Sequence, residues 1–107
     1  MAEGVVIWCH NTDQLNEQLA KHVNSQKLLV MDFSASWCGP CRAIAPIVAE
    51  FAKKFTNVSF IKIDVDELKV VAQELRVEAL PTFMFLKKGR FVDKVVGAKK
   101  DELHETK

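Results

Sequence analysis

The sequence predicts an α/β protein in which one mixed β-sheet carries helices on both faces. Two observations lead to this prediction. Apolar runs alternate with amphipathic stretches, and three successive strand–helix units favour a parallel core with right-handed crossovers. The last two apolar runs, Thr82 to Leu86 and Phe91 to Val96, are joined by Lys87-Lys88-Gly89-Arg90, which is typical of an antiparallel hairpin.

The first third of the chain predicts two strands with a helix between them. Residues 5–9 are a short β-branched run and predict a strand. Asn11-Thr12-Asp13 supplies N-cap chemistry for a helix that ends at the polar turn 24–26. Residues 28–33 form an apolar run interrupted only by Asp32, as expected of a strand covered on both faces.

The rest of the chain predicts three helices and three strands. An amphipathic helix runs from about Cys38 to Phe55, and Pro46 inside it should cause a kink. A strand over 58–63 and a short helix over 68–75 precede the closing hairpin. A final helix over 100–107 has one clearly apolar residue, so we expect it to be weakly anchored.

Length and composition restrict the class of protein. A chain of 107 residues, 49% apolar and 27% charged, predicts a single domain over residues 1–107 with one core. A net charge of +1 argues against nucleic-acid or membrane-surface partners. No apolar run reaches the roughly 18–20 residues that span a bilayer, and no signal peptide is recognisable. We therefore expect a cytoplasmic protein, and a monomer by default.

The chemistry centres on Trp37-Cys38-Gly39-Pro40-Cys41, at the junction of a strand and a helix. Residues three apart on a helix share a face, so Cys38 and Cys41 can form a disulfide. Cys38 is predicted at the exposed helix N-terminus, where unpaired amides favour the thiolate, and is the candidate nucleophile. Cys41 would then attack Cys38 and release the reduced product. Trp37 could belong to the core or form an exposed platform.

Cys41 must lose a proton in order to attack, and Asp32 is the candidate acceptor. Burial on an apolar strand would raise the pKa of Asp32. A strand-end aspartate that caps or forms an ion pair is an equally good interpretation. Lys62 could bring its ammonium near Asp32, but an exposed edge lysine fits the pattern better. The Leu80–Pro81 bond is expected to be trans, because only about 5–6% of X–Pro bonds are cis.

A metal or haem site is a poor alternative for the two cysteines. Structural zinc usually needs four ligands. The other candidates lack the spacing of a second pair; they are Cys9, His10, His22 and His104. Haem attachment needs a histidine after the second cysteine, where this chain has Arg42. We therefore expect no metal and interpret Cys9 as a buried, inert thiol, with a peripheral regulatory thiol as the alternative.

With the cysteine motif, the upstream Asp32 and the downstream Leu80-Pro81-Thr82, the chain resembles the thioredoxin family over nearly its full length. The lead-in Phe33-Ser34-Ala35-Ser36 and the opening run that ends at Trp8-Cys9 look most like the cytosolic h-type thioredoxins of plants. This resemblance implies a thioredoxin fold, with a five-stranded mixed sheet of order 1-3-2-4-5 flanked by four helices.

The same resemblance implies an activity and a set of site residues. The chain would be a protein-disulfide reductase in which Cys38 attacks, Cys41 resolves and Asp32 serves as acid and base. Pro81 would be cis and pack against the disulfide, and with Gly39 and Pro40 it would tune the redox potential. The implied docking surface for an extended substrate consists of Trp37, Gly39, Pro40, Leu80, Pro81, Gly97 and Ala98.

The implied partners are disulfide-containing target proteins and an NADPH-dependent thioredoxin reductase, and the chain itself would carry no cofactor. Two features depart from the family pattern: Ser34 replaces a tryptophan that some members have, and the C-terminal helix is short, as if trimmed. A different class of function is a redox-switched binding module, which docks partners without turnover.

Overall fold

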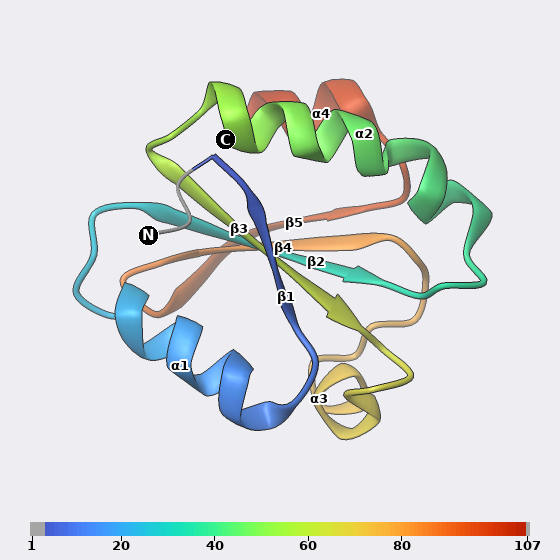
Figure 1. Ribbon diagram of the computed structural model, residues 1–107, viewed down its shortest axis with the longest axis horizontal. Helices are drawn as coiled ribbons and strands as arrows, with labels where there is room; N and C mark the ends of the chain where they lie inside the picture. The colour runs from blue at the N-terminus through green and yellow to red at the C-terminus, as the bar shows by residue number, and fades with distance from the viewer. Residues whose placement is uncertain (1–3, 107) are drawn as a thin grey trace.

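A five-stranded sheet forms the middle layer of the structure, a computed structural model that describes residues 4–106 (Figure 1). The strands are β1 (Val6–Cys9), β2 (Leu28–Ser34), β3 (Val58–Asp64), β4 (Thr82–Lys87) and β5 (Arg90–Val96). Their order is β1-β3-β2-β4-β5. The first three pair in parallel, whereas β4 runs antiparallel to β2 and β5 antiparallel to β4. The predicted mixed sheet and its implied strand order are confirmed.

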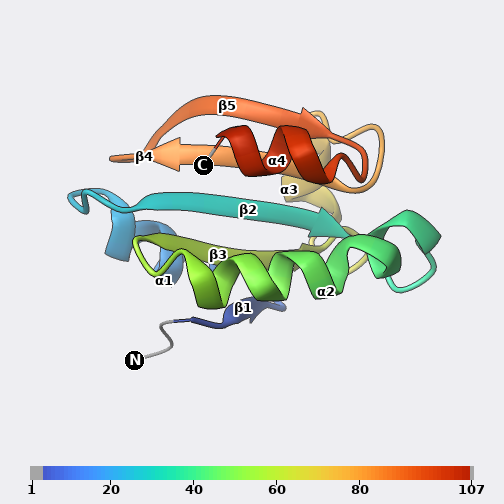
Figure 2. The same ribbon diagram turned by 90° about the horizontal axis from the view of Figure 1, so that it is seen from above.

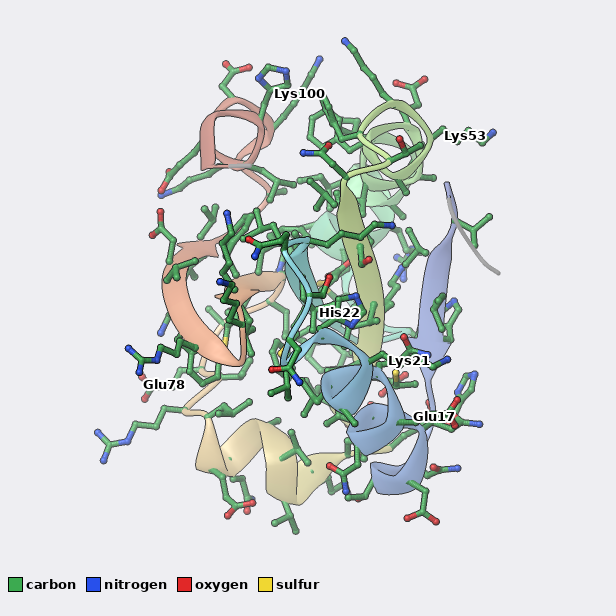
Figure 3. All side chains as sticks on the ribbon, turned by 90° about the vertical axis from the view of Figure 1, so that its left-hand side faces the viewer. Glu17, Lys21, His22, Lys53, Glu78 and Lys100 are labelled. Atoms are coloured by element: carbon green, nitrogen blue, oxygen red, sulfur yellow. A yellow bond between two sulfur atoms is a disulfide. The ribbon has the colours of Figure 1, made fainter. Side chains whose placement is uncertain are left out.

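Two helices cover each face of the sheet, which confirms the predicted helices on both faces. Helices α1 (Thr12–His22) and α3 (Lys69–Glu74) lie on one face, and α2 (Gly39–Lys54) and α4 (Lys100–Thr106) lie on the other (Figures 1 and 2). The outer side of α1 is charged, with Lys21 Nζ 3.4 Å from Glu17 Oε1, one turn away (Figure 3). Residues 1–3 of the predicted domain and Lys107 of the predicted last helix lie outside the described residues.

Because both faces are covered, the sheet has a hydrophobic core on each side. Side chains along a strand alternate between the faces, so β2 sends Val30 to one core and Leu29 and Met31 to the other. The core against α2 and α4 contains Val30, Ile44, Val48, Phe51, Ala52, Val58, Phe60, Phe83, Phe85, Val95 and Leu103. The core against α1 and α3 contains Cys9, Leu15, Leu29, Met31, Phe33, Ile61, Ile63, Leu68, Met84 and Leu86.

Residues 35–38 connect β2 to α2 and are called the β2 loop here. Helix α2 begins directly after this loop and runs back along the sheet. Cys38 is its N-cap and Pro40 lies in its first turn, where a missing amide hydrogen costs nothing. Pro46 lies inside the helix, as predicted, and Figure 2 shows the helix axis bending toward its N-terminal end. This path leaves the first turn of α2 at the carboxyl edge of the parallel strands.

The last helix, α4, contacts the core through Leu103 and the ring of His104. Leu103 is 4% exposed and belongs to the core beneath α2. The ring of His104 lies 5.6 Å from that of Phe51 and 5.7 Å from that of Phe55. A weak attachment was expected because only Leu103 is apolar. The exposed imidazole of His104 adds a contact with two aromatic rings, and Leu103 is the one buried side chain among the described residues of this helix, so the expectation stays a prediction.

The hairpin between β4 and β5 turns on two residues in the left-handed region, Lys88 at φ 52° and Gly89 at φ 78°. Positive φ at both central residues is the requirement of a type I′ turn. β4 is almost wholly buried, whereas β5 is an edge strand with mostly exposed residues. The turn therefore sets the pairing of the residues next to it, and a register shift between Phe85 and Leu86 changes the pairing farther along the hairpin.

We expect Gly89→Ala to lower the free energy of unfolding by about 1 kcal/mol, because a Cβ is disfavoured at positive φ. Gly39→Ala is the matched control, since a Cβ there meets nothing within 4 Å and the residue has no positive φ. Urea unfolding of both variants checks this. Equal stability of the two would contradict the role given to the turn.

Candidate active site

Cys38 and Cys41 form a disulfide at the point where the β2 loop enters α2. Their Cα atoms are 5.3 Å apart, within the usual range for a disulfide. The backbone amide of Cys41 donates to Cys38 Sγ at 3.2 Å. A sulfur that accepts a hydrogen bond at a helix N-terminus is stabilised in its negative form, because the amide and the helix dipole act in the same direction.

Both sulfurs are less accessible than the sequence suggested. Cys38 is 4% exposed and Cys41 is 3% exposed, so the expectation that Cys38 lies at an exposed mouth is wrong for the disulfide-bonded state. Ala35 is buried with the two cysteines, and Val65 and Leu80 pack against this cluster. These apolar neighbours come from other segments, so the helix position of Cys38 alone could not reveal them.

Trp37, next to the disulfide, is an exposed platform. Its side chain is 65% exposed, and its indole Nε1 donates to Asp66 Oδ2 at 2.9 Å. Asp66 follows β3 and lies 29 positions from Trp37 in the chain, so residue spacing did not predict this contact. The hydrogen bond fixes the orientation of a ring that stands in solvent beside the sulfurs.

Arg42 braces the loop that precedes the disulfide. Its Nη1 donates to the carbonyl oxygen of Ser36 at 2.7 Å, and the amide of Cys38 donates to the carbonyl of Ala35 at 3.2 Å. Residue spacing did not predict this contact of Arg42. The two bonds hold the loop against the first turn of α2.

The Leu80–Pro81 bond is cis. The expectation from general frequencies was trans and is wrong, whereas the resemblance implied the observed form. The carbonyl oxygen of Pro81 accepts from the amide of Gly97 at 2.7 Å. This contact joins the start of β4 to the end of β5, and it places two of the expected docking segments beside each other.

Asp32 is 3% exposed in the middle of the sheet. Its Oδ1 is buried and accepts no hydrogen bond from any described residue. Burial raises the pKa of Asp32 to about 7, and the positive charge of Lys62 partly offsets this effect. Among the described residues Asp32 forms neither a helix cap nor an ion pair, so that interpretation is wrong. With a pKa of about 7, the carboxyl can exchange a proton near neutral pH.

Lys62 lies directly beside Asp32. It belongs to β3, which pairs with β1 on one side and β2 on the other, so the interpretation as an edge lysine is wrong. The register pairs Asp32 with Lys62, and both line a cavity of about 150 Å³ under α2. The sequence could not settle this, because strand order and not strand composition decides which strand is at the edge.

Cys9 does not belong to this site. Cys9 is fully buried, and burial followed by the charge of Glu17 raises its thiol pKa. Among residues 4–106, no three His, Cys, Asp or Glu side chains gather in a way that could hold a metal ion. Within the same residues, no helix is both long and apolar enough to cross a membrane.

The family model described as Thioredoxin matches residues 6–106. The chain belongs to the thioredoxin family. A Thioredoxin H-type from Ricinus communis is 64% identical over 104 residues, which cover 97% of this chain and 88% of the relative. The crystal structure of thioredoxin NaTrxh from Nicotiana alata has a TM-score of 0.91 and 48% identity, covering 94% of this chain and 88% of that one.

One similar solved structure is a complex of a thioredoxin with a reductase. In the crystal structure of the ferredoxin:thioredoxin reductase and thioredoxin f2 complex, a chain 31% identical to this one aligns with a TM-score of 0.90, covering 99% of this chain and 94% of that one. The paired cysteines and these relatives make this chain an h-type thioredoxin, a thiol–disulfide oxidoreductase of the protein-disulfide reductase class. The binding-module alternative is not favoured.

The buried Asp32 makes stability depend on pH. Its folded pKa of about 7 exceeds the value of about 3.9 in an unfolded chain, so ionisation opposes folding as pH rises from 4 through 7. Full ionisation would cost about 4 kcal/mol. We expect Asp32→Asn to match the wild type in stability near pH 4, to exceed it increasingly up to about pH 7, and to keep a nearly constant advantage from there to pH 8.5.

Urea unfolding of the disulfide form at several pH values measures this difference. Asp93→Asn, at an exposed aspartate on β5, is the control and should run parallel to the wild type. Parallel curves for Asp32→Asn as well would show that the carboxyl is not buried in its neutral form.

Proposed function

We propose that the chain reduces disulfides in target proteins by dithiol exchange. The observation that carries this is the Cys38 sulfur at the α2 N-terminus, hydrogen-bonded by the Cys41 amide and joined to the second sulfur. In the reduced form the Cys38 thiolate attacks one sulfur of the target disulfide and the other leaves as a thiolate. Cys41 then attacks Cys38, releases the second target sulfur and leaves the Cys38–Cys41 disulfide, so two electrons pass to the target.

Asp32 is proposed to take the proton from Cys41 and later to return it. Its carboxyl lines the cavity under α2 together with Ala45, which follows Cys41 by one helical turn. A pKa of about 7 suits a group that both accepts and donates a proton at neutral pH. The position of the carboxyl behind the helix suits a role on the inner cysteine.

The docking surface is proposed to combine the exposed ring of Trp37 with the neighbouring loops. Trp37, Gly39, Pro40 and Ala98 are exposed, and Leu80 is partly buried against the cysteines. The Gly97 amide bonds to Pro81, which supports a continuous surface for an extended substrate segment. Gly39, Pro40 and Pro81 are proposed to set the redox potential: the first two lie between the cysteines in sequence, and Pro81 follows Leu80, which packs against the cysteines.

The proposed electron donor is an NADPH-dependent thioredoxin reductase, in a cytoplasmic electron-transport chain. A reductase partner in general is supported by the complex of a related thioredoxin with a ferredoxin:thioredoxin reductase, and the NADPH dependence rests on the resemblance to h-type thioredoxins alone. We also propose that residues 1–107 act as a single, monomeric domain. The single domain is supported by the cores on both faces of one sheet, which the described residues form. Gel filtration tests whether the protein is a monomer.

We expect the wild type to reduce insulin disulfides in the presence of thioredoxin reductase and NADPH, and Cys38→Ser to be inert. Cys41→Ser should accumulate mixed disulfides, because the first attack still occurs and resolution does not. Turbidity of the insulin chains and mass spectrometry provide the two readouts. Cys9→Ser is the control and should remain active. An active Cys38→Ser variant would refute the assignment.

We expect Asp32→Ala to slow resolution of the mixed disulfide on the order of 100-fold near pH 7, because Cys41 loses its proton acceptor. The first attack, measured in a Cys41→Ser background, should change much less. Rapid mixing with a chromogenic disulfide separates the two steps. If both steps slowed by the same factor, Asp32 would have no specific role toward Cys41.

A further inference from the structure

Three side chains form a row across the parallel part of the sheet. The register pairs Trp8 of β1 with Lys62 of β3, and Lys62 in turn with Asp32 of β2. Partners in register on parallel strands point to the same face. The three side chains therefore share the α2 side of the sheet, with the ammonium-bearing side chain between an indole and a carboxyl.

All three residues line one small cavity. It measures about 150 Å³, and α2 contributes only Ala45, Val48 and Ala49 to its wall. The Asp32 carboxyl lies against this space, and its Oδ1 has no hydrogen-bond partner among the described residues, the Lys62 ammonium included. The cavity gives the flexible lysine side chain room to approach Asp32 or to leave it.

The lysine is held at the indole. Lys62 Nζ lies 4.8 Å from the centroid of the Trp8 ring, within the range of a cation–π interaction. The ring itself is braced by His10, which stacks on it at 5.6 Å with an interplanar angle of 6°. His10 Nδ1 is in turn 2.9 Å from Glu67 Oε1. His10 and Glu67 thus hold the indole in place while it binds the Lys62 ammonium.

Few charged groups act on this arrangement. On the sheet, Lys62 is the charged neighbour of Asp32, and the β4 partner of Asp32 is Phe83. The α2 side chains that line the cavity are uncharged, and the two cysteines of that helix are bonded to each other. His10, which stacks on the Trp8 ring, and Glu67, which contacts His10, are the titratable groups next to the indole. The position of one ammonium therefore controls the field at Asp32.

We propose that Trp8 is a positioning residue for disulfide exchange: its ring holds the Lys62 ammonium away from the carboxyl of Asp32. A free ammonium would move toward the carboxylate as it forms and stabilise it. Trp8 competes for that cation, so Asp32 keeps its proton to a higher pH. The consequence for turnover rests on the proposed function, in which Asp32 serves Cys41.

The test follows the titration of Asp32 itself, by the ¹³Cγ chemical shift of its carboxyl in the disulfide form, where neither Cys38 nor Cys41 titrates. We expect Trp8→Leu to lower the midpoint by about 0.5 unit or more. Trp8→Phe, which keeps a ring face, should lower it less. Lys62→Met should raise the midpoint, because the stabilising charge is gone.

The decisive comparison is Trp8→Leu in the Lys62→Met background. If the ring acts through the ammonium, most of the downward shift disappears there. An unchanged midpoint in Trp8→Leu, an upward shift, or an equal downward shift in both backgrounds would overturn the proposal; the last would mean that Trp8 only excludes water. His10→Gln keeps the indole and removes a titrating neighbour, so the Trp8→Leu shift should persist in that background.

Two further measurements keep the outcome unambiguous. If Trp8→Leu does not fold, Trp8→Phe decides by the same criterion: a downward shift supports the proposal only if it disappears in the Lys62→Met background. Insulin reduction is measured separately. A protein that fails to reduce insulin refutes the proposed function, whereas the Asp32 titration still decides whether Trp8 positions Lys62.

Discussion

The site depends on the junction between β2 and α2, where a helix N-terminus receives a sulfur atom. The amide of Cys41 donates to Cys38 Sγ, and the helix dipole adds to the same stabilisation of negative charge. The sheet makes this junction rigid, because β2 is paired on both edges and buried from Leu29 onward. A mobile loop could carry two cysteines but could not keep one of them at the positive end of a helix.

A second constraint lies behind that junction. Placing Asp32 in the sheet interior costs stability whenever the carboxyl is ionised, and nothing among the described residues bonds to its Oδ1. Such a cost is typical of a group retained for chemistry rather than for folding. Lys62 reduces the cost from the neighbouring strand, and Trp8 determines how closely the ammonium can approach.

The fold was largely predictable because its signals are local. Asn11 caps α1 as its side-chain chemistry indicated, and Gly89 provides the positive φ that the hairpin requires. Two errors concern contacts between distant segments: Lys62 was assigned to an edge and Cys38 to an exposed mouth. Each depends on which strand or loop lies alongside, and residue spacing contains no such information. The third error is the Leu80–Pro81 bond, which is cis although general frequencies favour trans.

By itself, the sequence determined that Cys38 and Cys41 lie one helical turn apart at a strand–helix junction, with Asp32 on the preceding strand. Those relations follow from backbone geometry over a few residues. Only the tertiary structure decided that Lys62 lies between Asp32 and Trp8, that Asp66 orients Trp37, and that Gly97 meets Pro81. These contacts join residues that are far apart in the chain, and they exist because burying both faces of the sheet selects one strand order.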